Sequence, residues 1–145
     1  MLFRSVYLAK DRKELDRIYE KIKYKPFLLQ KYIAESAGRD IRLYVIGGKT
    51  VGACERHSDS DFRSNVQWGG KMRLITADKA YVAAAETAAR IIGLDYCAVD
   101  FLVTKDGPLL CEVNSNAFFG AYRARGGKDI ASLYVQHILK KLRQK

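Results

Sequence analysis

The spacing of hydrophobic side chains predicts three helices in this chain. Each has an apolar residue at every third or fourth position, which places the apolar residues on one face of an α-helix. Asp11 and Glu14 resemble a capping box at the start of the first helix. Thr76 is predicted to cap the second helix, and Gly93 to end it. The predicted helices cover residues 11–23, 77–92 and 130–142.

Shorter runs of apolar and β-branched residues predict the strands of one sheet. Gly47-Gly48 separates two of these runs and suits the two-residue turn of a hairpin. Residues 104–107 offer a second turn. The predicted strands cover residues 27–33, 40–46, 49–56, 72–75, 96–103 and 108–114, and residues 58–66 are a polar loop. This order of elements predicts an α+β fold with a largely antiparallel sheet and flanking helices.

Two carboxylates lie within the last two predicted strands. Asp100 is embedded in an apolar run, and Glu112 precedes Asn114 by two positions in the next run. With about three residues in the turn, Asp100 would lie opposite Glu112, about 5 Å away, and Leu110 and Asn114 would share the face of Glu112. Two ionised carboxylates this close repel each other unless a cation lies between them. Asp100, Glu112 and Asn114 therefore predict an oxygen-ligand site for Mg²⁺ or Mn²⁺, with hydrogen-bonded structural carboxylates as the alternative.

The composition restricts the classes of protein that fit. The 145 residues are 48% hydrophobic, which predicts one globular domain over residues 1–145. No signal peptide or membrane-spanning stretch is visible, and the three cysteines have no metal-ligand spacing. These features predict a cytoplasmic protein with reduced thiols. The net charge of +10 predicts an anionic partner, although much of this charge solvates the helices.

The polar loop suggests a second site. Arg63 offers a planar guanidinium that suits phosphate, and Gly69-Gly70 beyond it allows backbone N–H groups to approach an anion. A solvated loop that happens to contain one Arg remains the alternative for this pattern.

Taken together, these segments resemble the C-terminal half of ATP-grasp carboxylate–amine ligases. The resemblance is to the RimK-like ligases, which add glutamate to a ribosomal protein, and to their relatives in amino-acid and cofactor ligation. It extends from about residue 6 to residue 117, with the motifs in the expected order. The motifs are Leu29-Gln30-Lys31-Tyr32-Ile33, Arg39-Asp40-Ile41-Arg42, Asp61-Phe62-Arg63-Ser64-Asn65, Gly69-Gly70, Gly93-Leu94 before Asp100, and Glu112-Val113-Asn114-Ser115-Asn116.

The resemblance implies where ATP would bind. Asp40 would hydrogen-bond the ribose hydroxyls. The adenine would lie against the strand formed by Gln30, Lys31, Tyr32 and Ile33. Arg63 would bind phosphate and later the oxyanion of an acyl-phosphate, with Ser64 and Asn65 shaping that site. Arg63 and Asn65 are thus the expected catalytic residues.

The resemblance also implies the metal and the reaction. Asp100, Glu112 and Asn114 would hold Mg²⁺ or Mn²⁺ bridging the ATP phosphates. A carboxylate, from a small molecule or a peptide, would attack the γ-phosphate to give an acyl-phosphate. An amine such as an amino acid would then displace phosphate and form an amide. The metal and Arg63 would offset the negative charge, and no protein nucleophile is needed.

Two departures from the family pattern limit these expectations. Family members have an N-terminal jaw with a phosphate-binding Lys and a Gly-rich flap, and residues 1–5 contain no glycine. We therefore expect a truncated or split ligase, or a fragment, that is catalytically poor alone and associates with a separate N-terminal half or with itself. Residues 117–122 also differ from the usual continuation with Pro and Gly, which leaves the acceptor substrate undefined.

Two other functions fit part of the pattern. Asp100 followed by Glu112 and Asn114 resembles the metal site of restriction-type nucleases, but Asn114 stands where those enzymes have a catalytic Lys. A non-catalytic basic module that binds RNA fits the charge, but the aromatic-rich basic motif of single-strand RNA binders is missing. Nucleic acid is therefore the less favoured partner.

Overall fold

The computed structural model describes residues 6–64 and 70–144, and the chain divides into two compact units. The first unit is Met1–Tyr32 and the second is Ile33–Lys145.

The first unit contains the helix α1 (Arg12–Ile22). The backbone N–H of Glu14 donates to the Asp11 carboxylate at 2.8 Å, and the Glu14 carboxylate accepts from the Lys10 N–H at 3.0 Å. The predicted cap at Asp11 is therefore confirmed. Tyr19 on the helix packs edge-to-face with Phe27, at 5.9 Å between ring centroids.

The strand predicted over residues 27–33 is wrong. Residues 26–33 have no strand structure, and the side chains of Leu28 and Leu29 are exposed. A strand forms only where its backbone N–H and C=O groups pair with a neighbouring strand. The apolar pattern shows that a segment suits a strand, but it does not show that such a neighbour is present.

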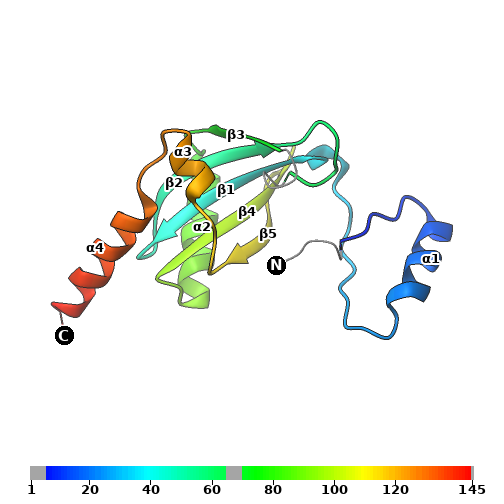
Figure 1. The fold of residues 1–145 in the computed structure, drawn as a ribbon, viewed down its shortest axis with the longest axis horizontal. Coiled ribbons are helices and arrows are strands. Elements are labelled where there is room, and N and C mark those ends of the chain that lie inside the picture. The colour runs from blue at the N-terminus through cyan, green and yellow to red at the C-terminus, as the bar shows by residue number, and fades with distance from the viewer. Residues whose placement is uncertain (1–5, 65–69, 145) are drawn as a thin grey trace. The chain divides into compact units, whose positions relative to one another are not determined.

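The second unit is built on a five-stranded antiparallel sheet with the order β3-β2-β1-β4-β5 (Figure 1). A short 3₁₀ turn, η2 (Ala34–Ser36), precedes the sheet. The sheet confirms the predicted α+β fold, and each strand agrees with its predicted range to within one residue at either end. The strands are β1 (Arg39–Ile46), β2 (Lys49–His57), β3 (Lys71–Leu74), β4 (Tyr96–Thr104) and β5 (Gly107–Asn114).

The β1–β2 hairpin closes where the sequence predicts. Ile46 pairs with Lys49, so Gly47 and Gly48 form a two-residue loop. Both glycines have positive φ, 57° and 73°, as the type I′ turn of a hairpin requires. The predicted hairpin is therefore confirmed.

The β4–β5 hairpin reaches its predicted register by an unpredicted route. Its loop has two residues, which by itself would place Asp100 opposite Cys111. A β-bulge after Asp100 skips Cys111, so Asp100 pairs with Glu112 as predicted. The bulge interrupts the alternation of side chains, and Leu110 pairs with Phe101. Leu110 therefore lies on the opposite face from Glu112, contrary to the prediction.

The helix α2 (Lys79–Ile92) covers one face of the sheet (Figure 1). Its N-cap is Asp78, so the predicted cap at Thr76 is wrong. The backbone N–H of Ile75 still donates to the Ala53 carbonyl of β2, at 3.2 Å, and the helix begins two residues later than predicted. Gly93 ends the helix as predicted. The core under α2 consists of Ile41, Leu43, Val45, Ala53, Tyr81, Ala85, Ala89, Cys97, Val99 and Phe101.

A second core lies on the other face, where α3 (Gly120–Ala124) and α4 (Ile130–Leu142) pack. The last helix was predicted, whereas α3 was not. Three tyrosines hold the segment that follows β5. The Tyr96 hydroxyl donates to the Ala117 carbonyl (2.7 Å), Tyr44 donates to the Phe118 carbonyl (3.1 Å), and Tyr122 is buried against Tyr44. This segment is therefore fixed to the face that carries the site described next.

The part of the chain that the structure describes contains no helix long and apolar enough to cross a membrane.

Candidate functional site

Charged side chains gather on the sheet face opposite α2. Strand pairing places Asp40 of β1 beside Arg56 of β2, and Arg42 of β1 beside Asp100 of β4. Glu112 of β5 continues this row, since it pairs with Asp100. Paired residues of an antiparallel sheet point to the same face, so the five side chains lie together on it.

Two aspartates and two arginines form a continuous network on this face. Arg42 donates from Nε and Nη2 to Oδ1 and Oδ2 of Asp100, at 2.7 Å in both bonds. Arg56 Nη2 donates to Asp100 Oδ2 at 2.8 Å. The same Arg56 guanidinium donates to both oxygens of Asp40, at 2.7 and 2.5 Å. Arg56 therefore bridges the two carboxylates, and we call these four side chains the Asp–Arg network.

Asp100 and Arg56 are the most buried side chains of the Asp–Arg network. The side chains of Arg56 and Asp100 are each 6% exposed. Burial by itself would raise the pKa of Asp100, but the hydrogen bonds and charges of Arg42 and Arg56 outweigh it and lower the pKa. Burial would likewise lower the pKa of Arg56, but Asp40 and Asp100 raise it. Two positive and two negative charges thus compensate one another.

The polar loop after β2 is attached to the Asp40 end of this network. The Ser64 hydroxyl donates to Asp40 Oδ2 at 2.5 Å. The Gly38 N–H donates to the Phe62 carbonyl and the Gly38 carbonyl accepts from the Ser58 N–H, both at 2.8 Å. These bonds hold both ends of the segment 58–64 beside the start of β1.

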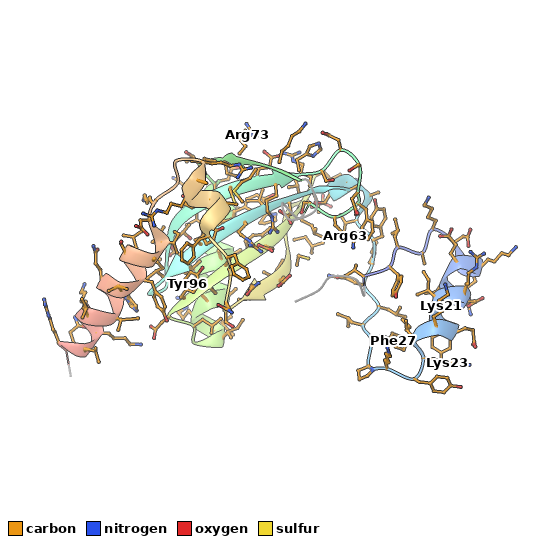
Figure 2. The ribbon with its side chains drawn as sticks, viewed as in Figure 1. Lys21, Lys23, Phe27, Arg63, Arg73 and Tyr96 are labelled. Atoms are coloured by element: carbon orange, nitrogen blue, oxygen red, sulfur yellow. The ribbon has the colours of Figure 1, made fainter. Side chains whose placement is uncertain are left out.

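Arg63 is oriented by its own loop. Its Nε and Nη2 donate to the two oxygens of Asp61 at 3.0 and 2.6 Å, and its guanidinium lies 5.4 Å from the centre of the Phe62 ring. The hydrogen bonds from Arg63 lower the pKa of Asp61 to about 2. Arg63 lies at the end of the sheet opposite to Tyr96 (Figure 2). A phosphate that bound Arg63 through the same nitrogens would have to replace Asp61.

The structure brings the three predicted metal ligands together on one face. Asp100 pairs with Glu112, and Asn114 pairs with Ala98 one step further along the same face. Glu112 is exposed, and the Asn114 side-chain oxygen accepts from the Asn116 N–H at 2.9 Å. Within residues 6–64 and 70–144, no three His, Cys, Asp or Glu side chains form a cluster that could hold a metal. A cation here would therefore need oxygens from a ligand or water as well, which is how Mg²⁺ is bound beside phosphates.

The other predicted site residues are distributed differently. Gln30, Lys31 and Tyr32 belong to the first unit, whereas Ile33 and Asp40 belong to the second. Asn65 lies outside the described residues. An open hollow of about 470 Å³ lies elsewhere, lined by residues 47–49, 86, 89, 90 and 93–95, and none of the predicted site residues lines it.

Two residues of the site were not predicted to belong to it. The sequence patterns assign Arg42 no role beyond its place in a motif, and they assign no role to Arg56. Arg42 lies between the core residues Ile41 and Leu43 of β1, and Arg56 lies two positions after the buried Cys54 of β2, on the same face. An Arg at such a position requires an acidic partner, so an inward Arg on each of two predicted strands was a usable signal.

The fold is that of the ATP-grasp ligases. D-alanine–D-alanine ligase from Bacillus anthracis, solved with ATP, superposes with a TM-score of 0.65 at 18% identity, over 90% of this chain and 46% of that one. The macrocyclase MdnC from Microcystis aeruginosa, bound to its precursor peptide MdnA, gives a TM-score of 0.63 at 20% identity, over 93% of this chain and 41% of that one. At these identities the likeness concerns the fold.

The sequence identifies the family within this class. The RimK-like ATP-grasp domain matches residues 3–138, so the chain belongs to that family. A probable alpha-L-glutamate ligase from Marinomonas sp. is 38% identical over 139 residues, which are 94% of this chain and 46% of the relative. A protein of the same name from Parasynechococcus marenigrum is 38% identical over 96% of this chain and 30% of its own length. The chain thus spans less than half the length of these relatives. The resemblance deduced from the motifs is confirmed.

Proposed function

We propose that this chain supplies the ATP- and Mg²⁺-binding surface of an ATP-dependent carboxylate–amine ligase, as one ATP-grasp subdomain over residues 1–145. The observation that carries the proposal is the pairing of Asp100 with Glu112 on the face that also holds Asp40 and Ser64. This face offers anionic and hydroxyl groups for a nucleotide and its cation in one row. Membership of the RimK-like family favours this function over a nuclease or an RNA-binding module.

The nucleoside would bind at the Asp40 end of the row. Asp40 has four lone-pair positions, of which Arg56 takes two and Ser64 takes one. One position on Oδ1 is left to accept a hydrogen bond from a ribose hydroxyl. The adenine would lie against the backbone of Gln30 to Ile33, a role assigned from the family motif alone.

The phosphates would extend from Asp40 toward Arg63, Ser64 and the metal ligands. Mg²⁺ held by Asp100, Glu112 and Asn114 would neutralise charge on the phosphates when it is bound. Arg63 would exchange its carboxylate partner Asp61 for a phosphate oxygen and would stabilise the charge that develops on the transferred group. Asn65 would assist Arg63, as the family motif implies.

The reaction would join an acid to an amine. A substrate carboxylate attacks the γ-phosphate, its oxygen forms a bond to phosphorus, and ADP leaves. The amine nitrogen then attacks the acyl carbon of the acyl-phosphate, phosphate leaves with the electrons of the broken C–O bond, and the nitrogen loses a proton to phosphate or water. The names of the relatives support glutamate as the amine. The peptide complex of the macrocyclase supports a peptide carboxylate as the acid.

Calorimetry tests the proposed site. A non-hydrolysable ATP analogue should bind the chain with an affinity that depends on Mg²⁺, and the double variant Asp100→Ala/Glu112→Ala should lose that dependence. Asp16→Ala on α1 is the matched control, because Asp16 is an exposed carboxylate far from the predicted ligands in sequence. Binding that needs no metal and is unchanged in the double variant would contradict the assigned site.

Turnover tests the activity. ATP hydrolysis and amide formation are measured with a panel of acids and with glutamate among the amines. We expect little turnover from this chain alone, and formation of N-acylglutamates, in which glutamate is the amine, if a segment that completes the cleft is supplied. Robust turnover by the chain alone would contradict the expectation of a catalytically poor protein.

A further inference from the structure

Asp100, the central predicted metal ligand, already accepts three hydrogen bonds from guanidinium groups. Arg42 donates to both of its oxygens, and Arg56 donates to Oδ2 alone. The Asp100 side chain is 6% exposed, and those of Arg56 and Arg42 are 6% and 12% exposed. These partners are therefore a fixed part of the site rather than a surface contact.

The three bonds restrict how Asp100 can meet a cation. A carboxylate has about four lone-pair positions, two on each oxygen. Arg42 makes two parallel hydrogen bonds, one to Oδ1 and one to Oδ2, so its guanidinium covers the side of the carboxylate between the two oxygens. A cation must occupy that same side to contact both oxygens. Arg56 takes the remaining position on Oδ2. Only one position on Oδ1 is then left for a metal.

We propose that Arg42 is a positioning residue that makes this site select Mg²⁺ or Mn²⁺ over Ca²⁺, an inference that rests on the proposed function of Asp100, Glu112 and Asn114. Ca²⁺ takes six to eight oxygens and is commonly chelated by both oxygens of a carboxylate. Mg²⁺ is smaller, is octahedral, and is satisfied by one oxygen from each carboxylate together with phosphate and water. By covering the chelating edge of Asp100, Arg42 limits this carboxylate to one oxygen for the metal, which suits Mg²⁺ better than Ca²⁺.

The charge balance of the site supports a metal that arrives with a nucleotide. The Asp–Arg network is neutral by itself, and Glu112 adds one negative charge. A divalent cation alone would therefore leave the row positive beside two buried guanidiniums. The phosphates of ATP supply the missing negative charge, so selection is to be measured on the metal–nucleotide complex.

The test compares two metals in the full chain and in the variant Arg42→Lys. A Lys keeps the positive charge but cannot cover the edge of a carboxylate with two parallel bonds. The dissociation constant of a fluorescent, non-hydrolysable ATP analogue is measured with saturating Mg²⁺ and with saturating Ca²⁺. We expect the wild-type chain to bind the Mg²⁺ complex about tenfold more tightly or better, and Arg42→Lys to bring the two constants close together. A merely structural role for Arg42 would weaken both complexes equally and leave their ratio unchanged.

Arg39→Lys is the matched control, because Arg39 starts the same strand, is 44% exposed and pairs with Glu55. It should keep the wild-type ratio. Two results would overturn this proposal and leave the proposed function standing. In the first, binding depends on metal but the wild-type dissociation constants with Ca²⁺ and with Mg²⁺ are nearly equal. In the second, Arg42→Lys leaves the ratio of these constants unchanged. A wild-type chain that binds neither metal complex would overturn the proposed function and this proposal together.

A measurement on the wild-type chain covers the case in which Arg42→Lys does not fold. The Arg42 Nε–H signal in a nitrogen–proton NMR spectrum reports its hydrogen bond to Asp100 Oδ1. This signal should stay protected from exchange with water when the Mg²⁺–analogue complex is bound. Loss of protection on binding would show that Asp100 leaves Arg42 to take the metal, and would overturn the proposal.

Discussion

Gly38 is the position where a single methyl group should disturb the site most. It has a φ of 65°, and a Cβ added there would lie 2.5 Å from the Ser58 carbonyl oxygen and 2.8 Å from that of Asp61. Both atoms are backbone, so neither can rotate away. The same two residues belong to the loop that carries Arg63.

The cost of Gly38→Ala has two parts. A left-handed backbone conformation costs a non-glycine residue about 1–2 kcal/mol. Forcing a methyl group into a filled space costs about 1–3 kcal/mol more. We therefore expect the free energy of unfolding to fall by about 2–5 kcal/mol, and analogue binding to weaken because the loop that carries Arg63 must shift.

Gly48→Ala separates the two parts. Gly48 also has a positive φ, 73°, but a Cβ added there would meet no atom within 4 Å. This variant should lose only about 1–2 kcal/mol and should bind the analogue as the wild-type chain does. Urea unfolding followed by circular dichroism gives both free energies. Equal losses in the two variants would refute the argument from the carbonyl contacts.

Three further predictions follow from buried and paired groups. Arg56→Met should destabilise the fold by about 3–5 kcal/mol because it leaves two buried carboxylates without their shared partner. Arg73 lies on the edge strand β3 (Figure 2), and its side chain is 75% exposed, so Arg73→Ala should cost less than about 1 kcal/mol. Equal losses in urea unfolding would contradict the burial argument. The pKa of Asp61 is about 2 in the folded chain against an ordinary 3.8, so its contribution to stability is complete above about pH 4 and is lost as the pH falls through 2. Asp61→Asn should therefore flatten the stability–pH curve between those values, and an unchanged curve would refute the pairing. At pH 8 the exposed Cys111 should react first with a thiol reagent. Cys54 is buried and its pKa is raised to about 11, so it should react only after unfolding. Equal reaction rates of the two thiols would contradict the burial of Cys54.

Local patterns predicted most of the elements. Gly47-Gly48 predicts a turn, because both positions need positive φ and glycine meets that need without strain. Asp11 with Glu14 predicts the start of α1, because the contacts involved are a few residues apart. Local patterns gave wrong predictions for the strand over residues 27–33 and for the helix cap at Thr76. In both cases the local structure depends on which backbone hydrogen-bond partners another part of the chain provides. The spacing of apolar residues carries no information about those partners.

The site shows the same division. The sequence by itself determined that Asp100 and Glu112 belong to neighbouring strands, and the family motifs marked Arg63 and Ser64. Only the tertiary structure decided that Cys111 is skipped by a bulge and that Asp100 is held by Arg42, a residue 58 positions away along the chain. The physical reason is that β1 lies between β2 and β4, so the pairing of strands that are distant in sequence decides which side chains are neighbours. Which guanidinium meets which carboxylate follows from that order, and from the cost of leaving either one buried alone.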